Sequence, residues 1–421
     1  MNYKIFPPEE ILQAELELPL SKSMSARALI INKIGGFDVD IELSNSDDTQ
    51  ALAKGLDITE GTVDIGAAGT AMRFLTAYYA ASAGTDIILT GTERMQKRKI
   101  GVLVEALRSI GAEIEYLGEE GYPPLHIRGK KLKGGDVEMD PSVSSQYVSA
   151  LMMIGPMLEE PLTLKFEMEP TSLSYIKMTA AMMAQAGVEP ERAFNRIEVP
   201  NTPYVAPITT IEKDWSSASY WYAIGALTAG WVTLKNMELE SIQGDSVMKT
   251  LGERIGVITS ESEDVEGALE LSASPEQHSR LDLDMSDTPD LVQTLAIAAA
   301  ALGIPFHFTG IHTLRGKETD RLEALKAEAL KLGLIFEVDG NKSISWEGSR
   351  VPIPELPRIR TYEDHRMAMA FVPVSVFLPG IIIEDVEVVS KSYPRFWKDL
   401  QEAGFILMDP DAKVENSETE E

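Results

Sequence analysis

Residues 327–338 read AEALKLGLIFEV, and this short stretch carries the pattern that decides the fold. Its first half has the spacing of an amphipathic helix, Gly333 ends that helix, and the β-branched and aromatic residues that follow are typical of a strand. The same order of helix, glycine and strand recurs elsewhere in the chain. The other copies are 106–116 with Gly111, 182–189 with Gly187, 251–259 with Gly256, 400–408 with Gly404 and, more weakly, 52–58 with Gly55.

The five clear glycines lie 76, 69, 77 and 71 positions apart, a spacing that fits about six times into 421 residues. A period of this size predicts an α/β fold built from a repeated supersecondary unit of strands and helices. The alternative is coincidence, since helices in any α/β protein often end at glycine.

The composition limits the classes of protein to which this chain can belong. Apolar residues make up 44% of it, which is enough for buried cores in two or three domains. The formal net charge of −28 repels phosphate backbones and anionic lipids, so we expect neither a nucleic-acid partner nor a membrane partner. The chain has no Cys and five scattered His, and we expect no metal site.

The start of the chain and its longest apolar segments do not have the patterns of a leader or of a membrane span. Residues 1–17 mix four Glu with two Pro and lack the basic and apolar regions of a leader, so we expect a cytoplasmic protein. The apolar segments 291–308 and 367–383 are interrupted by polar residues or prolines and are expected to be buried helices and strands. Residues 409–421 are acidic and are expected to form a solvated tail.

Long apolar helices are predicted to begin at six places. The openings lie at 21–23, 69–70, 144–146, 214–217, 287–290 and 363–366. Ordinary N-caps explain each of them singly. Helices this apolar must be buried nearly all round, however, so we expect their N-termini to open onto an interior cleft, where their partial positive charge favours an anion.

The few basic residues are placed where they can serve such an anion site. They lie at or near the helix openings or in short polar loops: Lys22, Arg27, Arg73, Arg98, Lys317, Arg321, Arg366 and Lys391. Lys317 and Arg321 share a face if residues 317–321 are helical. Each pair alone is more typical of a solvated surface, so the prediction depends on the whole set.

Eight short strings in a fixed order make the chain similar to a known family. They are SKSMSAR (21–27), AGTAMR (68–73), LTG with RMQKR (89–91 and 94–98), GYPP (121–124), SSQ (144–146), Asp214 with SSASY (216–220), KETDR (317–321) and DHRMAM (364–369). The match extends over residues 18–397. The sequence resembles the 5-enolpyruvylshikimate-3-phosphate (EPSP) synthases, a family of enolpyruvyl transferases.

The resemblance implies a two-domain inverse α/β barrel of six βαβαββ repeats, three per domain, with the active site in the interdomain cleft. By this analogy residues 1–20 and 212–408 form one domain and residues 21–211 form the other. The reaction implied is transfer of the enolpyruvyl group of phosphoenolpyruvate to the 5-hydroxyl of shikimate 3-phosphate, with release of phosphate, in the shikimate pathway to chorismate and the aromatic amino acids. Such a transferase is expected to need no cofactor and to act as a monomer on these two small anions.

The residues that match the family's substrate sites form two overlapping sets. Shikimate 3-phosphate is held, by the resemblance, by Lys22, Ser23, Arg27, Ser144, Ser145, Gln146, Ser172, Tyr175, Asp290, Thr313 and Lys317. Phosphoenolpyruvate is held by Lys22, Gly69, Arg98, Gln146, Glu318, Arg321, Arg366 and Lys391. The residue types suit two anions, because Arg offers a planar fork to carboxylate or phosphate and Ser supplies further donors.

Three of these residues are expected to be catalytic. The 5-hydroxyl loses a proton as it attacks and the enol methylene gains one, which gives a tetrahedral intermediate that expels phosphate. Asp290 and Glu318 are the expected acid-base carboxylates, and Lys22 is the expected cation at the phosphate and the developing charge. Two plainer interpretations stay open: Asp290 caps a helix, and Glu318 only pairs with Arg321.

Four positions depart from the residues usual in the family. Ala67 and Thr313 replace Asn, and Phe74 and Lys99 replace Pro. Ala67 removes an amide near the enolpyruvyl pocket, and Phe74 changes the helix that carries Arg73. Because every charged residue of the pattern is present, we expect catalysis to survive and the response to the inhibitor glyphosate to be altered.

Three other interpretations compete with this one. The sister family that acts on UDP-N-acetylglucosamine usually has a loop Cys, which this chain lacks. A catalytically silent homologue that binds shikimate 3-phosphate is disfavoured, because Lys22, Asp290 and Glu318 are all present. The third is an unrelated α/β protein with many N-caps, which does not account for eight motifs in order.

Overall fold

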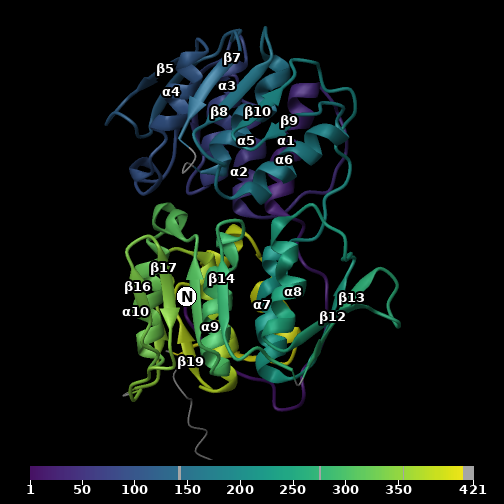
Figure 1. Cartoon of the computed structure of the whole chain (residues 1–421), viewed down its shortest axis with the longest axis vertical. Helices are drawn as coiled ribbons and strands as arrows, with labels where there is room; N and C mark the ends of the chain where they lie inside the picture. Colours follow the sequence, from purple (N-terminus) through teal and green to yellow (C-terminus); the bar gives the residue numbers. More distant parts are fainter. Residues whose placement is uncertain (141–143, 275, 354, 411–421) are drawn as a thin grey trace, which may run out of the picture.

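The structure, a computed structural model, describes residues 1–140, 144–274, 276–353 and 355–410. Its path forms two lobes stacked along the longest axis (Figure 1). The lower lobe contains the first two strands and the elements after residue 214, and the upper lobe contains the segment between them. The predicted tail falls almost wholly outside the described residues, because residues 411–421 are not among them.

The upper lobe has two four-stranded sheets and six α-helices among the described residues. The sheets are β3 (Glu60–Asp64), β4 (Asp86–Thr90), β6 (Leu125–Arg128) and β5 (Glu113–Tyr116), and β7 (Gly135–Met139), β8 (Leu162–Phe166), β10 (Arg196–Val199) and β9 (Glu191–Ala193), each in spatial order. The helices are α1 (Lys22–Gly35), α2 (Asp47–Leu56), α3 (Gly69–Ala81), α4 (Gly101–Ser109), α5 (Ser145–Ile154) and α6 (Leu173–Gln185).

The lower lobe has three four-stranded sheets and six α-helices among the described residues. The sheets are β2 (Gln13–Leu16), β11 (Trp231–Lys235), β13 (Ala268–Ala273) and β12 (Val257–Glu261); β14 (Leu281–Asp284), β15 (Phe306–Thr309), β17 (Ser343–Trp346) and β16 (Glu337–Asp339); and β18 (Arg358–Ile359), β19 (Ile381–Ile383), β1 (Tyr3–Phe6) and β20 (Ile406–Met408). The helices are α7 (Trp215–Thr228), α8 (Met248–Arg254), α9 (Val292–Leu302), α10 (Arg321–Lys331), α11 (His365–Phe371) and α12 (Phe396–Glu402).

All five sheets share one topology, which confirms the repeated unit. In each sheet the first two strands are parallel and two antiparallel strands complete it, as in β14, β15, β17 and β16. The sheet of β18, β19 and β20 follows the same order, with β1 from the chain start supplying its fourth strand. A helix follows each of the first two strands of such a unit, as α3 and α4 do after β3 and β4.

The five periodic glycines all end the second helix of a unit and lead into its third strand. Gly111, Gly187, Gly256, Gly333 and Gly404 have φ values of +104°, +89°, +88°, +73° and +92°. Because this left-handed region disfavours residues with a Cβ, glycine is required there, and the predicted C-cap pattern is confirmed.

The sixth unit differs from the others. Gly55 lies inside α2 and is no C-cap; a Cβ there would lie 2.6 Å from Leu75 Cδ1, so its small size serves close packing against α3. Residues 37–45 alternate between partly buried and exposed as a strand does, yet neither they nor residues 200–211 belong to a sheet. Three prolines among residues 200–207 lack the N–H that a ladder needs, which explains part of this difference.

Two separate hydrophobic cores underlie the lobes. One core contains residues between Ile5 and Leu18 together with residues between Trp215 and Phe405, and the other contains residues between Met24 and Ile208. The chain crosses between the lobes twice, and the crossings are bonded to each other: Ser21 N donates to Glu212 O at 2.8 Å, and Asp214 N donates to Pro19 O at 2.9 Å. We therefore propose the domain division 1–20 with 212–408, and 21–211, which the membership of the cores supports. In the part of the chain that the structure describes, no helix has the length and apolarity to cross a membrane.

Candidate active site

A cavity of about 570 Å³ between the lobes is lined by nearly all of the predicted site residues. Those that line it are Lys22, Ser23, Arg27, Gly69, Arg98, Ser144, Ser145, Gln146, Ser172, Tyr175, Asp290, Thr313, Lys317, Glu318, Arg321 and Arg366. The remaining predicted residue, Lys391, lines an adjoining cavity of about 440 Å³ that shares Asp48, Arg98 and Glu318 with the first. The two predicted substrate sets thus meet in one interlobe cleft.

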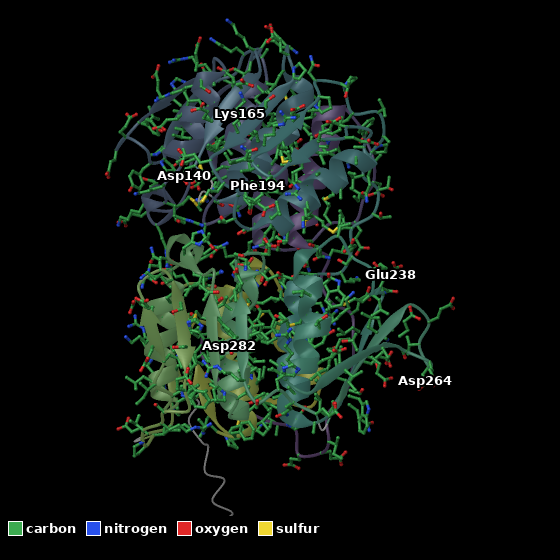
Figure 2. All side chains as sticks on the ribbon, in the orientation of Figure 1. Asp140, Lys165, Phe194, Glu238, Asp264 and Asp282 are labelled. Atoms are coloured by element: carbon green, nitrogen blue, oxygen red, sulfur yellow. The ribbon has the colours of Figure 1, made fainter. Side chains whose placement is uncertain are left out.

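This cavity is basic although the chain is acidic. Among the described residues, the cavity is lined by ten basic side chains (Lys or Arg) and only three acidic ones (Asp or Glu). The whole chain, in contrast, carries a net charge of −28. Acidic side chains lie instead on the outside, among them Asp140, Glu238, Asp264 and Asp282 (Figure 2). A positive cleft in a negative body concentrates the field inside the cleft and attracts small anions.

Helix N-termini converge on the cavity, as the sequence predicted. Residues from the first turns of α1, α3, α5, α6, α10 and α11 line it, as does a residue of the turn η4 (Pro289–Leu291) before α9. Ser21, Ser144 and Asp364 cap α1, α5 and α11 with their side chains, whereas Ala68 before α3 has no such cap. The opening of α7 differs from the prediction, because Asp214 and the first turn lie behind Arg366 and do not line the cavity.

Asp290, in η4, is held by side chains from three other elements. Its Oδ2 accepts a hydrogen bond from Tyr175 Oη at 2.9 Å and lies 2.9 Å from Arg366 Nη2; its Oδ1 lies 2.9 Å from Arg321 Nη1 and 3.7 Å from Lys317 Nζ. Burial opposes ionisation, but Arg366, Lys317 and Arg321 outweigh it and hold the pKa of Asp290 well below its usual range. Its side chain caps neither η4 nor α9, so the capping interpretation is wrong.

Glu318 lies between cations in the same way. Its Oε2 accepts a hydrogen bond from Arg321 Nη2 at 2.9 Å, and its Oε1 lies 3.6 Å from Lys391 Nζ. Burial raises the pKa of Glu318, but Arg321, Lys391 and Arg98 together hold it well below its usual range. Glu318 therefore pairs with Arg321, as the plainer interpretation had it, and also reaches a cation of the adjoining cavity.

The segment 317–320 is not helical, and α10 begins only at Arg321. Lys317 and Arg321 consequently do not share a helix face, and that conditional prediction is wrong. The two side chains still meet at Asp290, because the irregular segment turns Lys317 toward the cavity. Burial lowers the pKa of Lys317, and the charge of Asp290 partly offsets this.

Arg27 is buried and is bonded mainly to the protein itself. Its Nε donates to Thr179 Oγ1 at 2.7 Å, its Nη1 to Ser23 O at 2.8 Å, and its Nη2 to Ser149 Oγ and Tyr175 O at 3.2 and 3.3 Å. It forms no salt bridge to a described carboxylate, and burial lowers its pKa to about 10. A buried guanidinium without a countercharge favours a bound anion, and one of its five N–H groups is left for that ligand.

Two further arginines meet at the N-terminus of α3. A Cβ on Gly69 would lie 2.6 Å from Arg98 Nη1 and 2.9 Å from Arg73 Nη1, so only glycine leaves room for both. Burial and the like charge of Arg73 lower the pKa of Arg98 to about 10. The Nε atoms of both are buried without a hydrogen-bond partner among the described residues. Two adjacent guanidiniums at an uncapped helix N-terminus are well arranged for phosphate or carboxylate.

The remaining predicted residues have simpler surroundings. Lys22 Nζ lies 3.1 Å from Asp48 Oδ2, and Gln146 Nε2 donates to Thr70 Oγ1 at 3.2 Å. Ser172 precedes α6 with a left-handed φ of +54°, which is unusual for serine and fixes the entry of that helix.

The four departures from the family pattern all lie at or near the cavities. Ala67 is exposed in the wall of the smaller cavity, and Phe74 lies buried with its ring 5.6 Å from the Arg27 guanidinium. Lys99 lines the main cavity, and its carbonyl accepts a hydrogen bond from Tyr147 Oη at 2.6 Å. Thr313 Oγ1 is buried without a partner among the described residues, so its hydroxyl is free to bind a ligand.

Some residues of the charge network were not predicted as site residues. Asp364 accepts hydrogen bonds from Arg321 Nε at 2.7 Å and from Arg366 N at 2.9 Å, and Tyr220 Oη accepts one from Arg366 Nη1 at 3.3 Å. Asp364 lies within one of the motif strings, but a single sequence does not distinguish a helix cap from an arginine partner. Asp48 likewise has the sequence signature of an ordinary acidic residue in the first turn of a helix.

Similarity to known proteins agrees with this site. The family model for EPSP synthase (3-phosphoshikimate 1-carboxyvinyltransferase) matches residues 41–400. A 3-phosphoshikimate 1-carboxyvinyltransferase of Bacteroides fragilis is 47% identical over 96% of this chain and 98% of its own length. The chain belongs to the EPSP synthase family.

More distant EPSP synthases agree with this membership. A 3-phosphoshikimate 1-carboxyvinyltransferase of Shewanella woodyi is 36% identical over 92% of this chain and 96% of its own length. A solved EPSP synthase of Acinetobacter baumannii, 21% identical, covers 97% of this chain and 100% of its own with a TM-score of 0.74. That structural likeness concerns the fold alone and confirms the predicted two-domain α/β class.

The described residues 1–140, 144–274, 276–353 and 355–410 contain no group of three or more His, Asp or Glu side chains arranged to hold a metal ion.

Proposed function

We propose that this protein transfers the enolpyruvyl group of phosphoenolpyruvate to the 5-hydroxyl of shikimate 3-phosphate and releases phosphate, the EPSP synthase reaction of the shikimate pathway. One observation above all supports it: the residues matched to both substrates line a single basic cleft in a chain of the EPSP synthase family. We further propose that the protein acts as a monomer in the cytoplasm. The cleft is formed within one chain, which supports the monomer.

Shikimate 3-phosphate lies, in this proposal, against the upper lobe near the starts of α1, α5 and α6. Ser144, Ser145 and Ser172 supply neutral donors there, and Arg27 supplies a buried charge that no described carboxylate neutralises. Lys317 and Thr313 approach from the lower lobe, and the unpartnered Thr313 hydroxyl takes the role of the amide usual at that position. Charged and neutral donors together suit a phosphate ester that also carries hydroxyl groups.

Phosphoenolpyruvate binds where cations from both lobes face one another. Arg98 and the backbone at Gly69 come from the upper lobe, and Arg321, Arg366 and Lys391 come from the lower lobe. Arg321, Arg366 and Lys391 are paired with Asp290 and Glu318 in this arrangement. An incoming anion competes for those cations and so loosens their hold on the carboxylates.

This competition bears on the acid-base chemistry. A carboxylate whose pKa lies far below 7 is a weak base, since an effective general base has a pKa near the working pH. When phosphoenolpyruvate takes part of the positive charge of Arg366 and Arg321, the pKa values of Asp290 and Glu318 rise toward that range. We propose that these two carboxylates then move the protons and that Lys22 stabilises the developing charge.

We propose that contacts between the two lobes help to exclude water from the cleft once the substrates are bound. Side chains join the lobes on both sides of the cavity: Tyr175 reaches Asp290, and on the other side Arg94 Nη1 donates to Tyr362 O at 3.0 Å and to Glu363 Oε2 at 2.7 Å. With water excluded, the charged groups act at low dielectric and the intermediate is protected from hydrolysis.

The deciding experiment measures phosphate release by the purified protein, with no metal added. The protein receives phosphoenolpyruvate with shikimate 3-phosphate, each substrate alone, and phosphoenolpyruvate with UDP-N-acetylglucosamine as acceptor. We expect release only when shikimate 3-phosphate and phosphoenolpyruvate are both present.

Two other results would contradict the proposal. Release with UDP-N-acetylglucosamine would assign the chain to the sister activity. Calorimetric binding of shikimate 3-phosphate without phosphate release from any mixture would identify a silent homologue, and Ala67 and Phe74 would be the first positions to revert.

A further inference from the structure

Asp245 is a buried carboxyl group beside the cavity that belongs to neither substrate set. It lies in the turn η3 (Gly244–Val247) and is 4% exposed. Its Oδ2 accepts a hydrogen bond from Ser216 Oγ, whereas its Oδ1 is buried without a hydrogen-bond partner among the described residues. A buried carboxyl group with one bare oxygen and no paired cation is costly to keep ionised, and it calls for a physical explanation.

Ser216 connects Asp245 to Arg366. The hydroxyl of Ser216 also accepts a hydrogen bond from Arg366 Nη2 at 3.5 Å, and the same Nη2 lies 2.9 Å from Asp290 Oδ2. Arg366 is itself buried, and its Nε has no partner in the described part of the chain. One guanidinium therefore faces two aspartates, Asp290 directly and Asp245 through a hydroxyl group.

The charges around Asp245 do not balance it. Helices α6, α7 and α8 pack against η3. The titratable or charged groups on these helices are Tyr175, Lys177, Tyr220, Tyr222, Lys249, Glu253 and Arg254, and those on neighbouring segments include Glu212, Asp214, Asp287, Asp290 and Arg366. Lys249 is turned away, because its ammonium donates to Leu239 O and lies over the Trp215 ring. Lys177 and Arg254 line a separate cavity.

Burial and the negative charge of Asp290 raise the pKa of Asp245 to about 7, against the attraction of Arg366. Small changes of charge at Arg366 can therefore change the protonation of Asp245 at physiological pH.

We propose that Asp245 is a positioning residue that takes up a proton when phosphoenolpyruvate binds at Arg366, and that it thereby sets how the affinity for this substrate depends on pH. The inference rests on the proposed function, in which Arg366 holds an anionic group of phosphoenolpyruvate. The arriving anion adds negative charge beside Asp245 and disfavours its ionised form. The proton comes from solvent, adds to the carboxylate, and returns to solvent when the ligand leaves, so no bond of the substrate changes.

Thermodynamic linkage gives the direction in which pH changes the Michaelis constant for phosphoenolpyruvate. At pH values well below 7 Asp245 is already protonated, and binding needs no additional proton there. Above pH 7 the free protein must first take one up, so the Michaelis constant for phosphoenolpyruvate rises with pH, by at most about tenfold per pH unit.

The test compares the wild type with Asp245→Asn, which has nearly the same size and is neutral at every pH. Between pH 7 and pH 8.5 we expect the wild-type Michaelis constant for phosphoenolpyruvate to rise about three- to tenfold, and that of the variant to stay low and flatter, with kcat little changed. A gain of affinity at high pH is not expected from the loss of a purely structural group. The phosphate of the substrate titrates equally with both enzymes, so the difference between them reports Asp245.

Asp399→Asn is the matched control. Asp399 is also a buried aspartate, 2% exposed, with an oxygen that lacks a partner among the described residues, but it lies in α12 and lines neither cavity of the cleft. Its variant should follow the wild-type pH profile. Ser216→Ala should move the wild-type inflection to higher pH, because the hydroxyl hydrogen bond favours the ionised carboxylate.

Calorimetry provides a measurement that does not depend on turnover. Binding of phosphoenolpyruvate in the presence of shikimate 3-phosphate, at pH 7.5 in buffers of different ionisation enthalpy, should show roughly half a proton more taken up by the wild type than by Asp245→Asn. Equal proton uptake, or equal pH profiles for these two proteins, would overturn the inference. A wild type that releases no phosphate would contradict the proposed function instead, and calorimetry would still decide the role of Asp245. If Asp245→Asn does not fold, the wild type is measured by itself, and the absence of proton uptake on binding would overturn the inference.

Discussion

Tyr175 in the upper lobe donates a hydrogen bond to Asp290 in the lower lobe, with 2.9 Å between Tyr175 Oη and Asp290 Oδ2. The contact is reinforced nearby, where Ser174 Oγ donates to Asp287 O at 2.5 Å and Leu173 N donates to Asp287 Oδ1 at 2.9 Å. The first turn of α6 therefore holds the segment that carries a proposed catalytic carboxylate. The contact between the lobes and the orientation of Asp290 are consequently linked.

Removal of the Tyr175 hydroxyl should weaken catalysis without unfolding the protein. Tyr175→Phe is expected to lower kcat/KM for shikimate 3-phosphate about tenfold, the usual effect of losing one hydrogen bond to a charged group. Steady-state kinetics measures this. Tyr204→Phe is the control, because that buried hydroxyl donates only to Met153 O, inside the upper lobe. Equal effects of the two substitutions would show that the interlobe contact has no special role.

The proposed catalytic groups make a stronger prediction. Lys22→Ala and Asp290→Ala should each lower turnover at least about 100-fold with the fold intact, since each removes an electrostatic or acid-base group. Circular dichroism and phosphate release together measure this. Asp282→Ala, which removes an exposed carboxylate of β14, should leave turnover unchanged. Near-normal turnover of either site variant would refute the role given to that residue.

Arg27 should affect both binding and stability. Arg27→Ala is expected to raise the Michaelis constant for shikimate 3-phosphate, because it removes a buried cation at the site. It should also lower the unfolding temperature, because the guanidinium joins α1 to Ser149 and Thr179 on two other helices, and such buried bonds contribute about 1 to 3 kcal/mol. Kinetics and thermal melts separate the two effects. An unchanged Michaelis constant would place the substrate elsewhere.

His365 should make the stability depend on pH. It is buried, neither ring nitrogen has a hydrogen-bond partner among the described residues, and its Nδ1 lies 3.9 Å from Asp364 Oδ1. Burial, followed by the charges of Lys22 and Arg366, holds its pKa well below 6.5. Below pH 6.5 the unfolded chain gains a proton at this residue and the folded chain does not, so stability falls as the pH drops, by at most about 1.4 kcal/mol per unit. Thermal midpoints between pH 5 and pH 7 should decline less for His365→Asn than for the wild type. For His278→Asn, which replaces an exposed histidine, the thermal midpoint should decline as much as it does for the wild type.

Ala67 should decide part of the response to glyphosate. Its side chain lies in the wall of the cavity that contains Arg98 and Lys391. Ala67→Asn restores the amide usual in the family and is expected to strengthen inhibition by glyphosate several-fold, through about one added hydrogen bond. Inhibition curves at fixed phosphoenolpyruvate measure this. Wild-type inhibition that already equals that of relatives with Asn would contradict the expectation.

The repeat was predictable from the sequence, but its exception was not. Gly111 and its four equivalents stand where a left-handed backbone is required, and that requirement produces a visible period. Gly55 follows the same pattern for a different reason, the closeness of Leu75, and a single sequence does not separate these two uses of glycine. Residues 37–45 alternate like a strand, yet they join no sheet, because a strand also needs a neighbour with free backbone groups to pair with.

The gathering of the candidate residues in one cleft was predictable from the sequence, but the network of contacts among them was not. Cations at helix openings indicated an anion cleft, because such charges are few in this acidic chain. Which carboxylate meets which cation depends on the tertiary fold, so the sequence did not identify Asp364 as a partner of Arg321. For the same reason it did not show that Arg27, besides lining the cavity, hydrogen-bonds α1 to another helix. Asp245 carries no local signal, since its importance comes from Ser216 and Arg366, which are distant in sequence.

The paired crossings between Pro19 and Asp214 and between Ser21 and Glu212 give the upper lobe the form of an insertion whose two ends leave at one point. A gene that joins residue 19 to residue 214 through a short turn would therefore leave the path of the lower lobe nearly undisturbed. Conversely, the ends of residues 21–211 lie side by side, so we expect that a short linker can join them. The protein thus offers a natural place to separate the two halves of its cleft and to measure what each half binds by itself.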